Sequence, residues 1–141
     1  MSKKIYWANA LFSEADRKFN EDSVARVRAI GYIVFLPQEA FIKNADPTNK
    51  EIFKVDTEEL QSCDVIVACL DQFPIDAGVA CEIGVAYASG IPVIGLYTDI
   101  RRKRAGAGRM YKNQYVLGAI EARGEIASSI NELLDILPKY I

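Results

Sequence analysis

A single charged residue stands in an otherwise small and apolar segment of this sequence. Residues 77–89 read AGVACEIGVAYAS, and Glu82 is the one residue among them that carries a charge. This composition predicts a helix that is buried nearly all round. Apolar surroundings strip a carboxylate of its hydration, so such a group normally has a partner or a function. The alternative is that Glu82 faces a solvent gap or pairs with a distant arginine. We take Glu82 as the first candidate for chemistry.

The region around Glu82 is rich in acids and poor in cations. Between Lys54 and Arg101 the sequence has no lysine or arginine, and no Walker or G-x-G-x-x-G pattern offsets the negative charge. Gathered carboxylates suit a neutral polyol, and paired carboxylates break glycosidic bonds by nucleophilic attack and proton transfer. The acids of this stretch are Asp56, Glu58, Glu59, Asp64, Asp71, Asp76, Glu82 and Asp99.

Several of the candidate residues also have a purely structural explanation. Asp76 is a suitable N-cap for a helix that begins at Ala77. Asp64 is equally well explained as a turn acid, and Tyr6 as a core residue whose hydroxyl finds one partner. The basic run 101–104 is typical of a solvated loop, with a lid or an anion contact as the alternative.

Composition excludes several function classes. The 141 residues include no histidine, which rules out Ser-His-Asp and Cys-His catalysis and His-ligated zinc. Three cysteines at gaps of six and twelve residues match no metal or redox spacing, so we expect no metal. A net charge of −2 argues against a nucleic acid polymer as partner. Without an export signal or an apolar span, we expect no membrane contact and a cytoplasmic location.

Strands and helices are expected to alternate along a single domain, residues 1–141. Strands are predicted at 4–8, 32–36, 65–70, 91–97 and 125–126, and helices at 14–30, 51–62, 77–89, 113–123 and from Ser128 or Ser129 onward. In the second helix, Ile52, Val55, Glu59 and Ser62 are placed on one side.

This alternation predicts an α/β fold, a flavodoxin-like doubly wound five-stranded parallel sheet with helices on both faces. The expected strand order is 2-1-3-4-5. Ligands of such sheets bind beyond the carboxyl ends of strands 1 and 3, which here lead into the loops 8–13 and 70–76.

The residues at these positions resemble the nucleoside 2-deoxyribosyltransferase family. The string D-x-G-x-x-x-E-x-G-x-A is the specific part, and the sequence matches it at every fixed position from Asp76 to Ala86. Ile5-Tyr6 and Ser62-Cys63-Asp64 precede it in the same order as in the family. The likeness runs from residue 4 to at least residue 113, and residues 109–115 resemble the protozoan branch.

The resemblance implies three catalytic residues. Glu82 corresponds to the nucleophile, Tyr6 to the residue that orients it, and Asp64 to an acid near the base. The implied reaction transfers 2-deoxyribose between nucleobases through a glycosyl ester on Glu82, as in nucleoside salvage. It requires no cofactor, and the partners are deoxynucleosides and free nucleobases.

Six further residues are expected to bind substrate: Asp76, Gly78, Gln38, Phe12, Asn113 and Tyr115. The resemblance implies that Asp76 bonds the sugar hydroxyls and that Gln38 binds the base. It also implies that Asn113 reaches the site of a neighbouring subunit in a homodimer or higher homo-oligomer. The aromatic side chains of Trp7, Phe12 and Tyr115 are suited to stack on a planar base, and Trp7, which lies within the first strand, is at least as well explained as a core residue. Glycines in the family's first loop are replaced here by Ala8-Asn9-Ala10.

Two other functions remain open at this stage. One is an N-glycosidase that hydrolyses 2′-deoxynucleoside 5′-monophosphates, with the basic residues 101–104 and Arg109 as an anion site. The other is a nucleotide-binding module that keeps the fold without turnover. Release of free base from a deoxynucleoside separates an enzyme from such a module.

Overall fold

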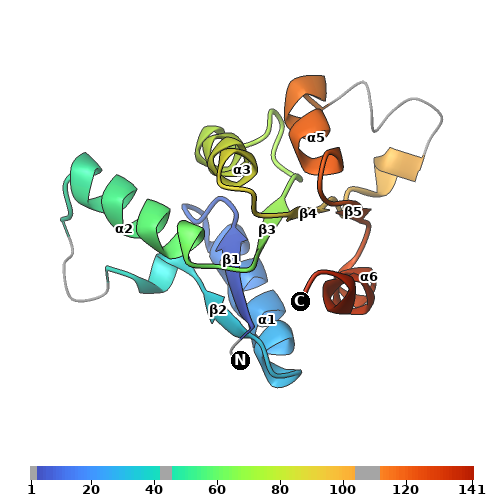
Figure 1. The fold of residues 1–141 in the computed structure, drawn as a ribbon, viewed down its shortest axis with the longest axis horizontal. Coiled ribbons are helices and arrows are strands. Elements are labelled where there is room, and N and C mark those ends of the chain that lie inside the picture. Colours follow the sequence, from blue (N-terminus) through green and yellow to red (C-terminus); the bar gives the residue numbers. More distant parts are fainter. Residues whose placement is uncertain (1–2, 42–45, 104–111) are drawn as a thin grey trace.

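The computed structural model describes residues 3–41, 46–103 and 112–141, which form a parallel β-sheet between two layers of helices (Figure 1). The sheet has the order β2-β1-β3-β4-β5, and all four neighbouring pairs are parallel. The predicted flavodoxin-like order is therefore confirmed. The strands are β1 (Lys4–Ala8), β2 (Ile33–Phe35), β3 (Val65–Cys69), β4 (Val93–Leu96) and β5 (Ile126–Ala127).

The helices fall where the apolar spacing predicts them, within a few residues at each end. They are α1 (Glu14–Ala29), α2 (Asn49–Gln61), α3 (Ala77–Ala88), α5 (Gln114–Glu121) and α6 (Ile130–Ile136), with short 3₁₀ turns η1 (Pro37–Glu39), η2 (Ile100–Lys103) and η3 (Leu137–Lys139). The end of the basic run, at residue 104, and Arg109 lie outside the described residues.

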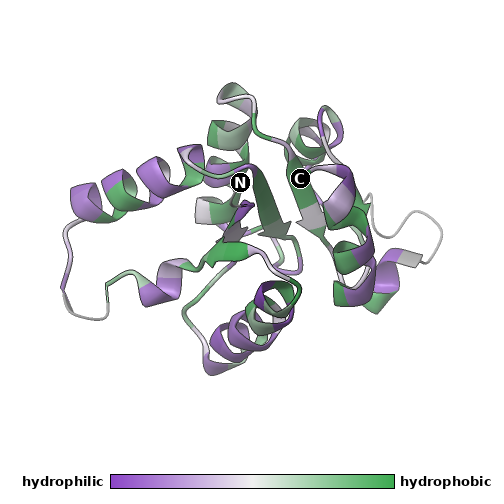
Figure 2. Cartoon of the chain, turned by 60° about the horizontal axis from the view of Figure 1, so that its bottom comes forward, coloured by the Kyte–Doolittle hydropathy of each residue, from purple (hydrophilic) through white to green (hydrophobic). Residues whose placement is uncertain are grey.

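Alternating side chains of the strands build two separate cores. Ile5 and Trp7 of β1 pack with α1 and α6, whereas Tyr6 and Ala8 pack with α2, α3 and α5. Each strand residue points to the face opposite that of its neighbour, so one strand supplies both layers. Figure 2 shows the result: the strands are mostly green, hydrophobic, while purple, hydrophilic segments run along α1 and α2. Tyr6 is thereby directed into the same layer as α3, which carries Glu82.

Local signals set the helix ends. Ser13 caps α1 by accepting a hydrogen bond from the Asp16 backbone N–H, at 3.0 Å. Gly31 and Gly90 follow α1 and α3 with φ angles of +102° and +75°. These left-handed conformations suit glycine, which has no Cβ to clash.

The outer face of α3 is exposed, contrary to the expectation of a helix buried nearly all round. Only Val79, Ile83 and Ala86 are fully buried, and they face the sheet. Cys81, Gly84 and Tyr87 are exposed. Helices α2 and α5 flank α3, but no described element covers its outer side. The apolar composition of α3 therefore exceeds what the described residues of its chain bury.

No helix within the described part of the chain is both long and apolar enough to cross a membrane.

Candidate active site

A cavity of about 730 Å³ opens beside the carboxyl end of β1. Its walls come from the loop after β1, from η1, from α2 and from the first turns of α3. Five of the residues predicted from the sequence line it, namely Phe12, Gln38, Asp76, Gly78 and Glu82. The topology thus gathers residues that are up to 70 positions apart, counted from Phe12 to Glu82.

Glu82 accepts a hydrogen bond from the phenol of Tyr6 through Oε2. Tyr6 has no exposed surface, and its ring stacks on that of Phe35 with 5.4 Å between centroids. Burial and the neighbouring Glu82 carboxylate raise the pKa of Tyr6 far above its usual value. The phenol therefore stays protonated and acts as a fixed donor, which holds one oxygen of Glu82 in place.

The environment of Glu82 raises the pKa of its carboxyl to about 7. Loss of hydration is the largest cause; the hydrogen bond from Tyr6 works in the opposite direction, and the charges of Asp56 and Asp76 add to the rise. Near neutral pH a substantial fraction of Glu82 is ionised and can attack an electrophilic carbon.

Asp56 of α2 lines the same cavity, although sequence reasoning assigned it no role. Its Oδ1 is buried and has no hydrogen-bond partner among the described residues. Burial raises the pKa of Asp56 to about 6. A carboxyl with a pKa raised in this way keeps its proton up to mildly acidic pH and is suited to act there as a general acid.

The spacing of α2 contains the signal that could have identified Asp56. Ile52, Asp56 and Leu60 recur every four residues; Ile52 and Asp56 line the cavity, as does the buried Leu60. These three residues define the inward face of α2. The face predicted from the sequence, with Val55 and Glu59, is displaced from it by about one residue. An acid in line with apolar residues at helical spacing marks a carboxylate turned toward the core.

Asp76 serves both as a helix cap and as a wall of the cavity. Its Oδ2 accepts a hydrogen bond from the Val79 backbone N–H at 3.1 Å. A Cβ added to Gly78 would lie 3.1 Å from the same oxygen. Glycine at position 78 therefore leaves room beside the Asp76 carboxylate, and both the structural and the functional readings of Asp76 are compatible with this geometry.

Phe12 and Gln38 occupy the side of the cavity nearest β1 and η1. Phe12 is 82% exposed, which leaves a planar apolar surface at the cavity wall. Gln38 is held by hydrogen bonds from Asn20 to its Oε1, at 2.9 Å, and from its Nε2 to Glu21, at 3.2 Å.

Three other predicted site residues lie away from this cavity. Asp64 precedes β3 and accepts a hydrogen bond from the Lys4 backbone N–H at 2.9 Å, at the amino edge of the sheet. The prediction that Asp64 lies beside the base is therefore wrong for the cavity of its own chain, because Glu82 lies near the opposite edge of the sheet.

Asn113 caps α5 by accepting hydrogen bonds from the backbone N–H groups of Tyr115 and Val116, and Tyr115 is 90% exposed. Their role in a neighbouring subunit's site stays a prediction.

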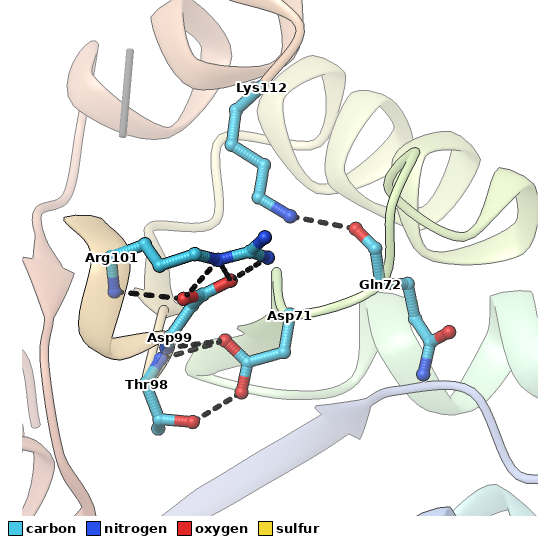
Figure 3. Close-up of polar contacts among 6 residues, drawn as sticks. All are labelled: Asp71, Gln72, Thr98, Asp99, Arg101 and Lys112. Carbon is cyan, nitrogen blue, oxygen red and sulfur yellow. Dashed lines mark hydrogen bonds and ion pairs between the residues drawn. The ribbon is translucent and has the colours of Figure 1, made fainter. Parts of the chain in front are cut away.

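A polar network holds the loop that leads into Asp76 (Figure 3). Asp71 accepts hydrogen bonds from the Thr98 backbone, at 2.7 Å, and from the Thr98 hydroxyl. The buried Lys112 donates to the Gln72 carbonyl at 2.7 Å. The ends of β3 and β4 are thereby tied to the start of α5.

The same network accounts for part of the basic run. Arg101 pairs with Asp99 at 2.6 Å, and the Arg102 guanidinium lies over the Tyr97 ring, 5.7 Å from its centroid. Neither arginine lines the cavity. The basic residue on the cavity wall, within the described ranges, is Arg17 of α1.

No group of three or more cysteine or acidic side chains in the described segments is placed to hold a metal ion.

The order of these residues along the chain matches a known protein family. The family model of nucleoside 2-deoxyribosyltransferases covers residues 5–125. The chain belongs to the nucleoside 2-deoxyribosyltransferase family. Membership of this family indicates that the protein is an enzyme. The narrower likeness to the protozoan branch stays a prediction.

Solved structures include several relatives of this family member. A conserved protein from Enterococcus faecalis V583 is 38% identical over the full length of both chains, with a TM-score of 0.90. A 2-deoxyribosyltransferase from Bacillus psychrosaccharolyticus is 23% identical, with a TM-score of 0.70 over 92% of this chain and 89% of that one. The CMP N-glycosidase of Clostridium botulinum is 22% identical, with a TM-score of 0.65 over 99% and 100%. The last two show the shared fold. A comparison with curated proteins found no match.

The raised pKa of Glu82 predicts a pH-dependent effect of Glu82→Gln on stability. Below about pH 4.5 the carboxyl is protonated in both folded and unfolded chains, so its burial carries no charge penalty. Between pH 4.5 and about 7 the unfolded chain ionises while the buried carboxyl keeps its proton, so the wild type loses stability on the order of 2 kcal/mol, and the loss is complete above pH 7. The amide has no such penalty and still accepts from Tyr6. We expect the variant to melt several °C above wild type at pH 8 and equally at pH 4.

Thermal melts at the two pH values check this prediction. Glu58→Gln, at an exposed position of α2, is the matched control and should keep the wild-type difference between them. Equal melting temperatures of Glu82→Gln and wild type at pH 8 would contradict a desolvated carboxylate.

Proposed function

We propose that the protein transfers 2-deoxyribose between nucleobases by double displacement. The observation that supports this most directly is the Glu82 carboxyl, held in the cavity by the buried Tyr6 phenol. The same cavity contains the Asp56 carboxyl, whose Oδ1 has no hydrogen-bond partner among the described residues. A nucleophile and a proton donor in one cavity are the two groups that cleavage of a glycosidic bond needs.

In the proposed first step, a carboxylate oxygen of Glu82 attacks C1′ of the deoxynucleoside. The C1′–N bond breaks, its electron pair stays on the base, and Asp56 supplies a proton to the departing base nitrogen. An ester between Glu82 and deoxyribose results. In the second step, a ring nitrogen of another base attacks C1′ and loses its proton to Asp56. The C1′–O bond of the ester breaks and its electron pair returns to the Glu82 carboxylate, so after two inversions the product has the original configuration. Asp76 binds the sugar hydroxyls, and Phe12 offers a stacking surface for the base.

Transfer rather than hydrolysis is the expected outcome when a second base is bound. A base that fills the cavity excludes water and is held in line with C1′. Deoxyinosine with excess adenine should therefore yield mainly deoxyadenosine. Chromatography measures the amounts of deoxyadenosine and of free deoxyribose. Free deoxyribose should dominate only without adenine. Free deoxyribose as the main product at saturating adenine would contradict transfer, and release of no base at all would favour the non-catalytic binding module.

Hydrolysis of a 5′-monophosphate is the second candidate, and Arg17 on the cavity wall is the observation that favours it. Its Nη1 donates to the Leu11 carbonyl at 3.1 Å, which fixes the guanidinium near the cavity. In this case a 5′-phosphate on the donor accelerates base release, and Arg17→Ala removes that acceleration. If the protein is a transferase of unphosphorylated nucleosides, a 5′-phosphate on the donor should not raise the rate of base release.

We also propose a homo-oligomer in which subunits share their sites. The uncovered apolar side of α3, which includes Cys81, Gly84 and Tyr87, is a surface that a second copy could bury. Asn113 and the exposed Tyr115 lie beyond the cavity of their own chain. Both observations fit a neighbour that completes the site.

Mixing two inactive variants tests this arrangement. Glu82→Ala and Asn113→Ala should restore part of the wild-type rate when mixed, because some hybrid assemblies contain one intact site. Light scattering gives the oligomeric state, and a tagged copy shows whether subunits exchange. No recovery under conditions of proven exchange would argue against a shared site.

A further inference from the structure

Asn20 of α1 is a buried amide with four hydrogen bonds. It is 1% exposed. Its Oδ1 accepts from the Trp7 indole N–H, at 3.0 Å, and from the Asn9 amide, at 2.8 Å. Its Nδ2 donates to the Ala10 carbonyl, at 3.1 Å, and to Oε1 of Gln38, at 2.9 Å. Such a fully satisfied network fixes the side chains that take part in it.

Two of these partners determine which way the Asn20 amide is turned. An indole N–H can only donate, so the atom facing Trp7 must be the oxygen of Asn20. A backbone carbonyl can only accept, so the atom facing Ala10 must be the nitrogen. Chemistry on both sides therefore allows one orientation of the amide.

The orientation of Asn20 is passed on to Asn9. The Asn9 atom that contacts Oδ1 of Asn20 must be its amide nitrogen, because two oxygens without a proton repel each other. Oδ1 of Asn9 is then left as an acceptor, and no donor among the described residues bonds to it. Asn9 lines the cavity.

Gln38 on the same wall also lacks a spare donor. Its Nε2 donates to the Arg17 carbonyl, at 3.3 Å, and to Glu21, at 3.2 Å. These two bonds use both amide hydrogens, and only a lone pair of Oε1 remains. The two amides that line the cavity beside β1 thus both offer acceptors, Asn9 more openly than Gln38.

We infer that Asn9 determines base specificity by accepting a hydrogen bond from an exocyclic amino group. The site then takes amino-bearing bases, adenine or cytosine, in preference to their oxo counterparts, hypoxanthine or uracil. An oxo group would place oxygen against oxygen at this position, and both would lose hydration without a bond in return. The inference rests on the proposed function, since it names the substrate class of the same cavity.

Steady-state base release from paired substrates tests the inference. We compare kcat/KM for deoxyadenosine against deoxyinosine, and for deoxycytidine against deoxyuridine. Because each pair also differs in intrinsic leaving-group ability, the decisive quantity is the wild-type ratio divided by the ratio of an Asn9 variant. We expect Asn9→Ala to lower the amino-to-oxo ratio about tenfold.

Two more variants make the result specific to the Asn9 acceptor. Asn9→Ser brings a hydroxyl that can donate or accept and should also lower the ratio. Asn49→Ala removes an amide from α2 at the same cavity, outside the Asn20 network, and should keep the wild-type ratio.

The outcomes separate this inference from the proposed function. Wild-type protein that cleaves none of the four nucleosides would defeat the proposed function itself. Cleavage with the same ratio in wild type and Asn9→Ala would overturn the inference and leave the function standing. Equal losses on amino and oxo substrates would also overturn it, as would a wild-type preference for oxo bases that Asn9→Ala leaves in place, which would point to a donor such as Arg17 at the base.

Discussion

Replacing Glu82 with alanine is expected to lower base release from deoxynucleosides by at least about a thousandfold, with the fold intact. The variant lacks the oxygen that attacks C1′, and among the described residues no other carboxylate accepts a hydrogen bond from the Tyr6 phenol. Glu82→Gln keeps the bond to Tyr6 but is a poor nucleophile, so a comparable loss is expected. The measurement is kcat for deoxyinosine, followed by chromatography of hypoxanthine.

The mass of the denatured protein provides a second readout. Wild type quenched with deoxyinosine should carry one deoxyribosyl adduct, which both Glu82 variants lack. Tyr6→Phe is the matched control, since it removes the fixed donor but not the nucleophile; we expect a loss of about 10- to 100-fold with the adduct still present. A Glu82→Ala rate within tenfold of wild type would contradict the assignment.

Glu82 could be predicted from the sequence because its signal is local. One charge among small apolar residues at helical spacing is visible without any tertiary information, and the alternation of strands and helices places that helix after β3. The strand order followed from the same alternation, since parallel strands need helical crossovers. The structure agrees with both predictions as far as the sheet and the place of Glu82 are concerned.

Asp64 and Asp56 show where local reading fails. Both are acids of the same cation-free stretch, but Asp64 directly precedes β3, whereas Asp56 lies within α2. In a parallel sheet a residue before a strand lies at the amino edge, whereas ligands bind at the carboxyl edge. The predicted topology already excluded Asp64 from the cavity of its own chain. Asp56 required the correct inward face of α2, and the face predicted from Val55 and Glu59 was displaced from it by about one residue.

The exposed side of α3 could not be predicted for a different reason. An apolar segment is equally suited to a core and to an interface, because both remove it from water. The apolar pattern of a segment predicts that it is buried, but it does not show whether the same chain or a second chain buries it. The same ambiguity applies to Tyr115, whose exposure becomes evident only when the start of α5 is placed.

The second large effect is expected for Asp56→Asn, which should slow cleavage of neutral nucleosides by about 100-fold. The amide is nearly isosteric but cannot deliver a proton to the departing base. The loss should depend on the leaving group. The base of 7-methyl-2′-deoxyguanosine already carries a positive charge and departs without protonation, so the variant should cleave this substrate within a few-fold of the wild-type rate.

The pH profile gives an independent test of the same role. Activity requires Glu82 ionised and Asp56 protonated, so kcat should rise as Glu82 loses its proton and fall as Asp56 loses its own. With pKa values of about 7 and about 6, the two groups titrate as a pair and the optimum lies between them. In Asp56→Asn the decline toward high pH should disappear, whereas Glu58→Gln, an exposed acid of the same helix, should retain the wild-type profile. Equal slowing of deoxyinosine and of the methylated nucleoside, with the decline preserved, would show that Asp56 shapes the cavity without donating the proton.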